Sequence, residues 1–143
     1  MRILIVENEP VLASITAEVL RDEGHQIIGP AYDLTEALWL AYRFPMDVAF
    51  VDIDLNGHEE GIYIANFLRV NYGVHSLFIT ANLSPAYDRG SDSIGVLRKP
   101  YTLTALLDSA LITQSWIAGE RSSIPNPRTL EIFKEREVAP TLQ

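Results

Sequence analysis

Side chains that could bind a metal ion or a phosphoryl group follow four short apolar segments of the sequence. They are Glu7, Asn8, Glu9, Asp52, Asp54, Thr80 and Lys99. Carboxylates gathered in one pocket repel one another, and a hard cation or a bound proton usually relieves that repulsion. Oxygen donors without histidine or cysteine favour Mg²⁺ over zinc. A hydroxyl and an ammonium group opposite the acids would suit a phosphoryl group bridged by that metal ion.

These residues can form one site only if the segments that precede them converge. Five short segments rich in Ile, Val, Leu or Phe are predicted strands, at residues 2–6, 25–29, 47–51, 76–79 and 94–97. Their continuous apolarity is typical of a parallel sheet that is covered on both faces. Helical patterns lie between and after them, from residue 10 to the glycine at 24, over about 33–43, 59–72 and 84–90, and from residue 102. Five strand–helix units predict an α/β fold, a three-layer sandwich with a five-stranded parallel sheet.

Helix limits follow from capping residues and from the spacing of apolar side chains. Pro10 suits the first position of a helix, Val11, Ile15 and Val19 recur on one face, and Gly24 ends the pattern. The predicted starts of the later helices are marked by Asp33, by Ser84 with Pro85, and by Thr102. In a sheet of this kind, ligands bind at the carboxyl ends of the strands, beside the topological switch point. The candidate residues therefore meet at one edge of the sheet.

Composition and charge exclude several classes of protein. The 143 residues are enough for one domain, and the absence of cysteine excludes a disulfide framework and a thiol nucleophile and suits the cytoplasm. The net charge of −8 argues against a direct contact with nucleic acid, which needs basic side chains to neutralise phosphates. The apolar runs are too short to span a membrane, and the first ten residues do not form a signal peptide.

The last part of the chain differs from the rest. Residues 1–120 carry 7 basic and 16 acidic side chains, a net −9, whereas residues 121–143 carry 4 and 3, a net +1. The tail contains three prolines and is too short for a core of its own. We therefore expect one domain over 1–120 and a C-terminal tail over 121–143, with a short helix over 128–137.

Four segments, in order along the chain, carry a resemblance to a known family. They are ILIVENEP at 3–10, DVAFVDIDL at 47–55, LFITAN at 77–82 and VLRKP at 96–100. Together they make residues 2–118 resemble the receiver domain of two-component response regulators, whose topology is flavodoxin-like. The resemblance implies a phosphoprotein of phosphorelay signal transduction rather than an enzyme that turns over a substrate.

The resemblance also assigns roles to residues. It implies that Asp52 accepts the phosphoryl group from a sensor histidine kinase or a histidine phosphotransfer protein, that Thr80 bonds the phosphate, and that Lys99 pairs with it. It implies a Mg²⁺ ion surrounded by Glu7, the residue at position 8, Asp52 and the main-chain carbonyl of Asp54. It further implies a cis peptide bond between Lys99 and Pro100, a known isomer for a bond that precedes proline.

The sequence departs from the family pattern at three places. Asn8 stands where the family usually has an aspartate, so we expect weakened Mg²⁺ affinity, with Glu7 or Glu9 partly compensating. Val96 stands where a rotating aromatic residue is common, and valine cannot change rotamer in that way. The loop at 56–61 (NGHEEG) is longer and more acidic than the usual turn. Signal output would then run through the backbone of 81–90 or through Tyr101, on a partner face formed by Val96, Pro100 and Tyr101.

Two functions remain open from the sequence. The first is a single-domain response regulator that signals through a contact with a downstream protein target, without nucleic acid or membrane, and the resemblance leaves a homodimer open. The second is a phosphorylation-independent, pseudo-receiver binding module, which Asn8 and Val96 favour and Asp52, Thr80 and Lys99 oppose. A flavin or nucleotide carrier on the same topology lacks a glycine-rich phosphate loop.

Overall fold

The computed structural model describes residues 1–90 and 92–133. In that part of the chain, six strands form one sheet in the order β2-β1-β3-β4-β5-β6. The strands are β1 (Arg2–Val6), β2 (Gln26–Ala31), β3 (Val48–Val51), β4 (His75–Thr80), β5 (Gly95–Arg98) and β6 (Leu130–Ile132). The first five are parallel, and β6 pairs antiparallel with β5. The predicted parallel α/β architecture is therefore confirmed, with a short sixth strand that the sequence did not predict.

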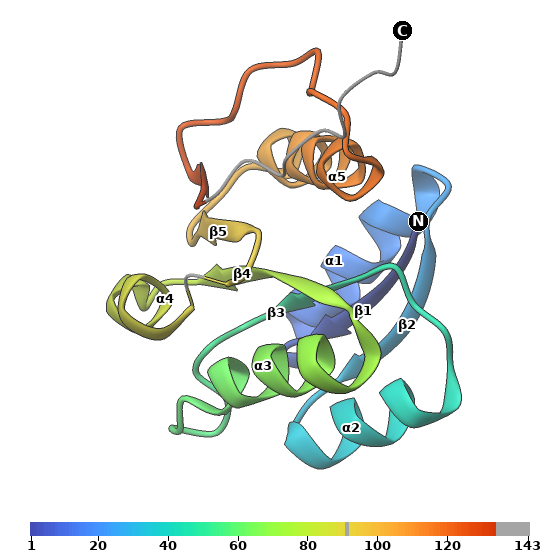
Figure 1. Cartoon of the computed structure of the whole chain (residues 1–143), viewed down its shortest axis with the longest axis vertical. Coiled ribbons are helices and arrows are strands. Elements are labelled where there is room, and N and C mark those ends of the chain that lie inside the picture. Colours follow the sequence, from blue (N-terminus) through green and yellow to red (C-terminus); the bar gives the residue numbers. More distant parts are fainter. Residues whose placement is uncertain (91, 134–143) are drawn as a thin grey trace, which may run out of the picture.

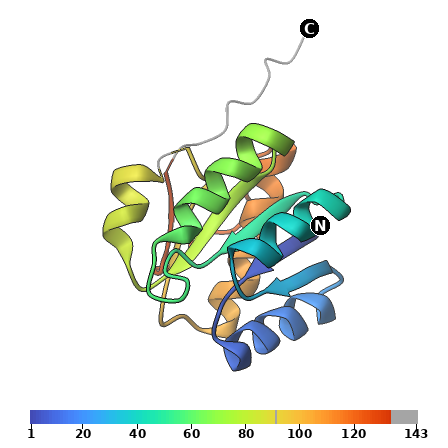
Figure 2. The same ribbon diagram turned by 90° about the horizontal axis from the view of Figure 1, so that it is seen from below.

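Five helices lie in the described residues, and each follows one of the parallel strands (Figure 1). They are α1 (Pro10–Asp22), α2 (Leu34–Arg43), α3 (Glu60–Tyr72), α4 (Leu83–Arg89) and α5 (Leu103–Ala118). Helices α1 and α5 pack together on one face of the sheet, and α2, α3 and α4 lie on the other (Figure 2). No helix in the described ranges is long and apolar enough to cross a membrane.

The core consists of two layers separated by the sheet. Because side chains alternate along a strand, Ile3 and Ile5 of β1 point into the layer beneath α1 and α5, whereas Leu4 and Val6 point into the other. Strand β3 is buried along its whole length, and Phe50 is 1% exposed. This two-sided burial explains why the strands are continuously apolar in the sequence.

Helix α1 turns inward a different face from the one that carries Val11 and Ile15. Val11 is 69% exposed and Ile15 is 43% exposed, so the apolar recurrence that indicated the helix does not mark its buried face at these two positions. The buried side chains of α1 are Ala13, Thr16, Ala17 and Leu20. Both sets recur at helical spacing, and the small side chains lie inward where α1 packs against the sheet and α5.

The predicted N-cap at Asp33 is confirmed, but the one at Ser84 is wrong. The Asp33 carboxylate accepts a bond of 2.8 Å from the main-chain N–H of Glu36, as a capping residue should. Helix α4 begins at Leu83, with Asn82 as its N-cap residue. The local Ser84-Pro85 signal is overridden because the side chain and the main chain of Asn82 are bonded to the polar residues at the end of the sheet.

The C-terminal segment forms a strand where the sequence suggested a helix. Residues Leu130–Ile132 make up β6, which contradicts the helix predicted over 128–137, and residues 134–137 of that prediction lie outside the described part of the chain. The physical reason is alternation: Leu130 is buried among the residues beneath α1 and α5, whereas the next side chain, Glu131, faces α4. A helix could not present both contacts to the edge of β5.

Candidate functional site

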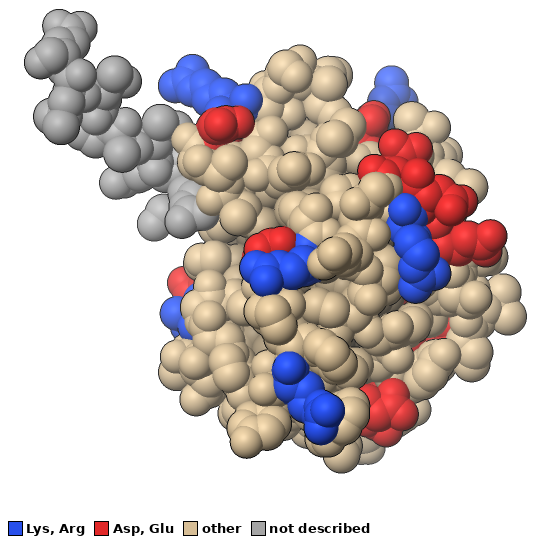
Figure 3. Space-filling view, turned by 90° about the vertical axis from the view of Figure 1, so that its right-hand side faces the viewer, with Lys and Arg blue, Asp and Glu red and all other residues tan. Residues whose placement is uncertain are grey.

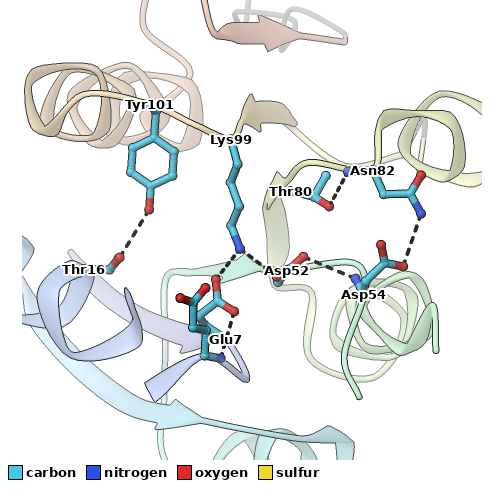
Figure 4. A network of polar contacts seen from close by, with 9 residues as sticks. Glu7, Thr16, Asp52, Asp54, Thr80, Asn82, Lys99 and Tyr101 are labelled. Carbon is cyan, nitrogen blue, oxygen red and sulfur yellow. Dashed lines mark hydrogen bonds and ion pairs between the residues drawn. The ribbon is translucent and has the colours of Figure 1, made fainter. Parts of the chain in front are cut away.

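The four predicted polar segments converge at the carboxyl ends of β1, β3, β4 and β5. Parallel pairing places Val6 beside Val51 and Val51 beside Phe78, so the loops that follow these strands leave the sheet at one edge. Asp52 continues this pairing, because its N–H donates to the carbonyl of Val6 at 2.9 Å. Figure 4 shows the resulting cluster, with Glu7, Asp52 and Lys99 at its centre. The convergence expected from the sequence is thus present.

Lys99 joins two carboxylates that come from different strands. Its Nζ lies 2.5 Å from Oε1 of Glu7 and 2.8 Å from Oδ2 of Asp52 (Figure 4). The Glu7 and Asp52 side chains are 7% and 10% exposed, and that of Lys99 is 18% exposed. One ammonium group therefore serves two nearly buried acids, which leaves the cluster with an excess of negative charge.

Burial and the neighbouring charges shift the acid–base equilibria of this cluster. Burial raises the pKa of Glu7 above its ordinary value; the hydrogen bond from Lys99 opposes that shift, and the charge on Asp52 adds to it. Burial alone would lower the pKa of Lys99, but its bonds to Asp52 and Glu7 outweigh this, and the pKa is raised. Lys99 therefore stays an ammonium ion at neutral pH. Burial and the charge on Asp52 make the ionised form of Glu7 less favourable.

A second polar chain connects Asp52 with the start of α4. The main-chain N–H of Asp54 donates to Oδ1 of Asp52 at 3.3 Å, and the Asp54 carboxylate accepts a bond of 3.2 Å from the Asn82 amide (Figure 4). The main-chain N–H of Asn82 donates to the hydroxyl of Thr80 at 3.0 Å, and Thr80 is 1% exposed. Asn82 was not among the residues predicted for the site, although its position directly before a helical pattern that contains Ser-Pro was a usable capping signal.

A glycine allows α3 to approach the loop that carries Asp52. A Cβ atom at Gly61 would lie 2.1 Å from the main-chain oxygen of Asp52 and 2.5 Å from the Cα of Ile53. The N–H of Gly61 also donates to the carbonyl of Ile53 at 2.9 Å. The first turn of α3 thus packs directly on the backbone of the candidate acceptor, and only glycine fits there.

The acidic loop before α3 forms an ion pair with α4. Its first residues form a tight turn in which Leu55 and His58 pair, and Asn56 has a positive φ of 54°. The carboxylate of Glu59 forms an ion pair with Arg89 of α4. The loop that follows β3 in the chain is therefore also in contact with α4.

The residues predicted for a partner face do not share one surface. Val96 is 2% exposed and lies in the core opposite Glu131 of β6, so it cannot contact a partner directly. Pro100 is exposed and follows a cis bond to Lys99, as the resemblance implied. Tyr101 is half-buried, and its hydroxyl lies 3.4 Å from that of Thr16.

The donor set is compatible with a Mg²⁺ ion that keeps several of its waters. In the described residues, no three acidic or histidine side chains gather closely enough to hold a metal ion by themselves. Mg²⁺, however, usually keeps several waters and is bound through one or two carboxylates together with phosphate oxygens. Glu7 and Asp52 supply two carboxylates on the same ammonium group, and half-buried Asn8 and the main chain at Asp54 follow the same strands and could add neutral oxygen donors.

The surface charge follows the acidic composition. On the face that Figure 3 shows, Lys and Arg side chains lie apart from one another, and acidic groups gather on one side. That face has no continuous basic stripe of the kind that tracks a phosphate backbone. The expectation that the chain does not bind nucleic acid directly stays a prediction.

Comparison with known proteins points to one family. The sequence matches the response regulator receiver domain family over residues 3–110. It is 29% identical over 109 residues to the transcriptional regulatory protein PdtaR of Mycobacterium tuberculosis, a match that covers 74% of this chain and 53% of PdtaR. The chain thus spans about half the length of these curated relatives.

Solved structures agree with this assignment. The response regulator TrrA of Thermotoga maritima, in complex with Mg²⁺–BeF, is 25% identical, with a TM-score of 0.68, over 76% of this chain and 95% of that chain. PhyR of Brucella abortus is 25% identical, with a TM-score of 0.67, over 80% of this chain and 49% of that chain. The chemotaxis response regulator CheY4 of Vibrio cholerae, 23% identical, with a TM-score of 0.67 over 76% and 94% of the two chains, shares the fold.

Proposed function

This chain belongs to the response regulator receiver domain family, and we propose that it accepts a phosphoryl group on Asp52 from a sensor histidine kinase or a histidine phosphotransfer protein. The observation that supports this most strongly is the position of Asp52 at the open end of the sheet, with Lys99 on one carboxylate oxygen and the N–H of Asp54 on the other. These contacts orient the carboxylate and reduce its charge repulsion towards an incoming phosphate.

The reaction we propose is a single transfer to the chain itself, not the turnover of a substrate. An oxygen of Asp52 forms the new O–P bond while the P–N bond of the donor phosphohistidine breaks. The imidazole leaves with the bonding electron pair and takes up a proton. Lys99 offsets charge on the phosphoryl oxygens, and the hydroxyl of Thr80 supplies a hydrogen bond once it turns from Asn82.

Magnesium belongs to this proposal as the cofactor. Glu7, Asp52, the amide of Asn8 and the main-chain carbonyl of Asp54 would hold the ion, and when bound it supplies positive charge to the phosphoryl oxygens. TrrA, a solved relative, was crystallised with Mg²⁺–BeF, which supports the same ion here. Because Asn8 contributes no negative charge, we propose that the affinity is lower than an aspartate at that position would give.

The phosphodonor would approach beside Lys99, where apolar surface is exposed. Ile15 of α1 and Leu103 of α5 are 43% and 52% exposed, and they line a hollow that also contains Lys99 and Pro100. Apolar side chains beside a charged reaction centre are typical of a protein-docking surface. We propose a cytoplasmic location, shared with the donor, and a protein target downstream.

Intact mass measurement with a small phosphodonor tests the acceptor. Incubation with acetyl phosphate and Mg²⁺ should give a single adduct of ~80 Da on the wild-type chain and none on Asp52→Ala. Asp54→Asn is the matched control, since it alters the neighbouring acid and should still accept the group. An adduct that persists in Asp52→Ala would refute the choice of acceptor.

A second function is favoured by a specific observation. Val96 is covered by β6, and position 8 carries an amide, so a phosphorylation-independent binding module with the receiver fold is the alternative. The same mass measurement separates the two functions. If the wild-type chain forms no adduct across a titration to high Mg²⁺ concentration, the binding module is the better account.

A further inference from the structure

The segment after α5 returns to the sheet and pairs with β5 on the side that faces away from β4. We call residues 124–133 the C-terminal strap. Its strand β6 pairs with β5 through Leu130 opposite Leu97 and Ile132 opposite Gly95. Two main-chain bonds flank this pairing: the N–H of Arg98 donates to the carbonyl of Thr129 at 2.8 Å, and the N–H of Phe133 donates to that of Ile94 at 3.0 Å. The strap therefore satisfies backbone groups that an edge strand would otherwise present to solvent.

The edge of β5 is shaped to receive this strand closely. A Cβ atom at Gly95 would lie 2.0 Å from the main-chain oxygen of Glu131 and 2.9 Å from the Cα of Ile132. Alternate side chains of the strap then enter both layers of the core: Leu130, 6% exposed, packs beneath α1 and α5, and Phe133 packs on the opposite layer. A glycine at the point of contact and burial on both sides indicate a specific seat rather than a chance contact.

The strap also binds the outer side of α4. The hydroxyl of Tyr87 donates to the carboxylate of Glu131 at 2.5 Å, and the ring of Tyr87 lies 5.6 Å from that of Phe133. Tyr87 sits five residues after Asn82, the N-cap residue of α4. Any shift of this short helix therefore changes the geometry of its contact with the strap.

The same helix is tied to the candidate phosphorylation site at its other end. Asn82 is bonded to Thr80 through its main chain and to Asp54 through its side chain, and Asp54 is bonded to Asp52. If the Thr80 hydroxyl turns to a phosphoryl group on Asp52, the N–H of Asn82 loses its acceptor, and the first turn of α4 must find a new position. A continuous set of contacts thus runs from the acceptor through α4 to Glu131 of the strap.

We infer that the C-terminal strap is an autoinhibitory segment: it closes the edge of β5 against pairing with a second copy of this chain, and phosphorylation of Asp52 unseats it. Removal of the strap would uncover an edge next to Ile94 and Val96, which are 0% and 2% exposed. An uncovered apolar edge strand pairs readily with another chain. The unseating step rests on the proposed function, whereas the closure of the edge does not.

Amide exchange and sedimentation on the 143-residue chain test whether the strap closes the edge of β5. Leu130→Asp places a charge in the buried seat and alters only the strap, and the matched control Leu111→Asp makes the same change at a leucine of α5 that is 52% exposed. We expect Leu130→Asp to speed exchange of the Arg98 and Phe133 amides about tenfold or more and to promote self-association. Leu111→Asp should do neither. Unchanged exchange and a monomeric Leu130→Asp chain would overturn the closure.

Two further variants distinguish loss of the strap contact from a general folding defect. Gly95→Ala changes the β5 side of the same contact, and Tyr87→Phe removes only the bond to Glu131. Both should speed exchange at Phe133 while the amides of β1 and β3 remain protected. Two results together would contradict the proposal that the strap opens locally. They are loss of exchange protection throughout the sheet in Leu130→Asp and an unchanged exchange rate of the Phe133 amide in Tyr87→Phe.

Beryllium fluoride with Mg²⁺ tests the unseating step on the wild-type chain. We expect exchange at Phe133 to rise by about threefold or more on its addition, and the Leu130→Asp chain to bind beryllium fluoride more tightly by the same factor, since coupling between two sites is reciprocal. An adduct at Asp52 together with unchanged exchange at Phe133 would overturn the unseating step and leave the proposed function intact. Absence of any adduct or beryllium fluoride binding would remove the proposed function and the unseating step, but not the closure of the edge.

Discussion

Three side chains from three strand ends determine the electrostatics of the site. Lys99 is bonded to both Glu7 and Asp52, so the cluster has two acids and one base in a largely buried position. A positive charge added by a metal ion is favoured there, and a negative charge added by a phosphate is not, unless a cation accompanies it. For this reason we propose that the residue at position 8, an amide here, affects how strongly such a cation is bound.

Asn8→Asp should tighten the binding of Mg²⁺. The added carboxylate supplies the missing charge, and we expect the dissociation constant to fall about tenfold, which corresponds to about 1.4 kcal/mol. The matched control is Asn71→Asp, which adds the same charge at the end of α3 that lies towards the opposite edge of the sheet. Isothermal titration with MgCl₂ measures both. Equal affinities for Asn8→Asp and the wild type would show that position 8 does not contact the ion.

The raised pKa of Glu7 predicts a pH-dependent stability in metal-free solution. A carboxyl group whose pKa is raised on folding contributes stability that is fully present below its ordinary value of 4.5 and is lost as the pH rises through the folded-state pKa. Glu7→Gln has no such group. The free energy of unfolding of the wild type, relative to that of Glu7→Gln, should therefore fall as the pH rises above 4.5. Urea titrations in EDTA from pH 4 to pH 8 measure this difference, and a flat or rising difference would contradict the assigned direction.

At the scale of the elements, close packing of α3 on the end of β3 holds the main chain of Asp52, the proposed acceptor, in place. Gly61→Ala should lower the free energy of unfolding by about 2–3 kcal/mol, because its Cβ would overlap the main chain of Asp52 and Ile53. Gly73→Ala is the control: it has open space and a φ of 66°, so it should cost about 1 kcal/mol through backbone strain alone. Urea unfolding measures both, and the rate of adduct formation with acetyl phosphate should fall only in Gly61→Ala. Equal losses of stability would contradict the role given to this contact.

The sequence predicted the elements best where local and tertiary preferences agree. Strand β1 is found at the predicted residues 2–6, because a strand covered on both faces is apolar without interruption. The start of α4 was predicted two residues too late, because bonds from Asn82 to distant residues override the local signal at Ser84. Strand β6 could not be predicted either, since three residues carry little pattern and their partner, Gly95, is known only from the fold.

The site shows the same division between what local pattern predicts and what the fold adds. The convergence of Glu7, Asp52 and Lys99 follows from the rule that parallel strands end at one edge. The covering of Val96 does not follow from any local pattern, because it depends on a segment more than thirty residues further along the chain. Which face of α1 is buried also depends on packing. The face with the smaller side chains packs against the sheet and α5, so Val11 is exposed.

For the whole molecule, the net charge of −8 predicts two separable effects of salt. Sodium chloride should stabilise the chain modestly by screening self-repulsion. Mg²⁺ at matched ionic strength should add a further stabilisation through its site, about 1.4 kcal/mol at a concentration of about ten times the dissociation constant. Thermal unfolding in the two salts measures the difference. Superimposable curves would contradict a specific Mg²⁺ site.

The measurement that tests the central claim most directly locates the phosphoryl group on the chain. Treatment with acetyl phosphate and Mg²⁺, followed by borohydride reduction, converts an aspartyl phosphate to homoserine, and peptide sequencing by mass spectrometry identifies the position. We predict homoserine at position 52 and at no other aspartate. Homoserine at position 54, or an unmodified Asp52 in a chain that has gained a phosphoryl group, would contradict the account.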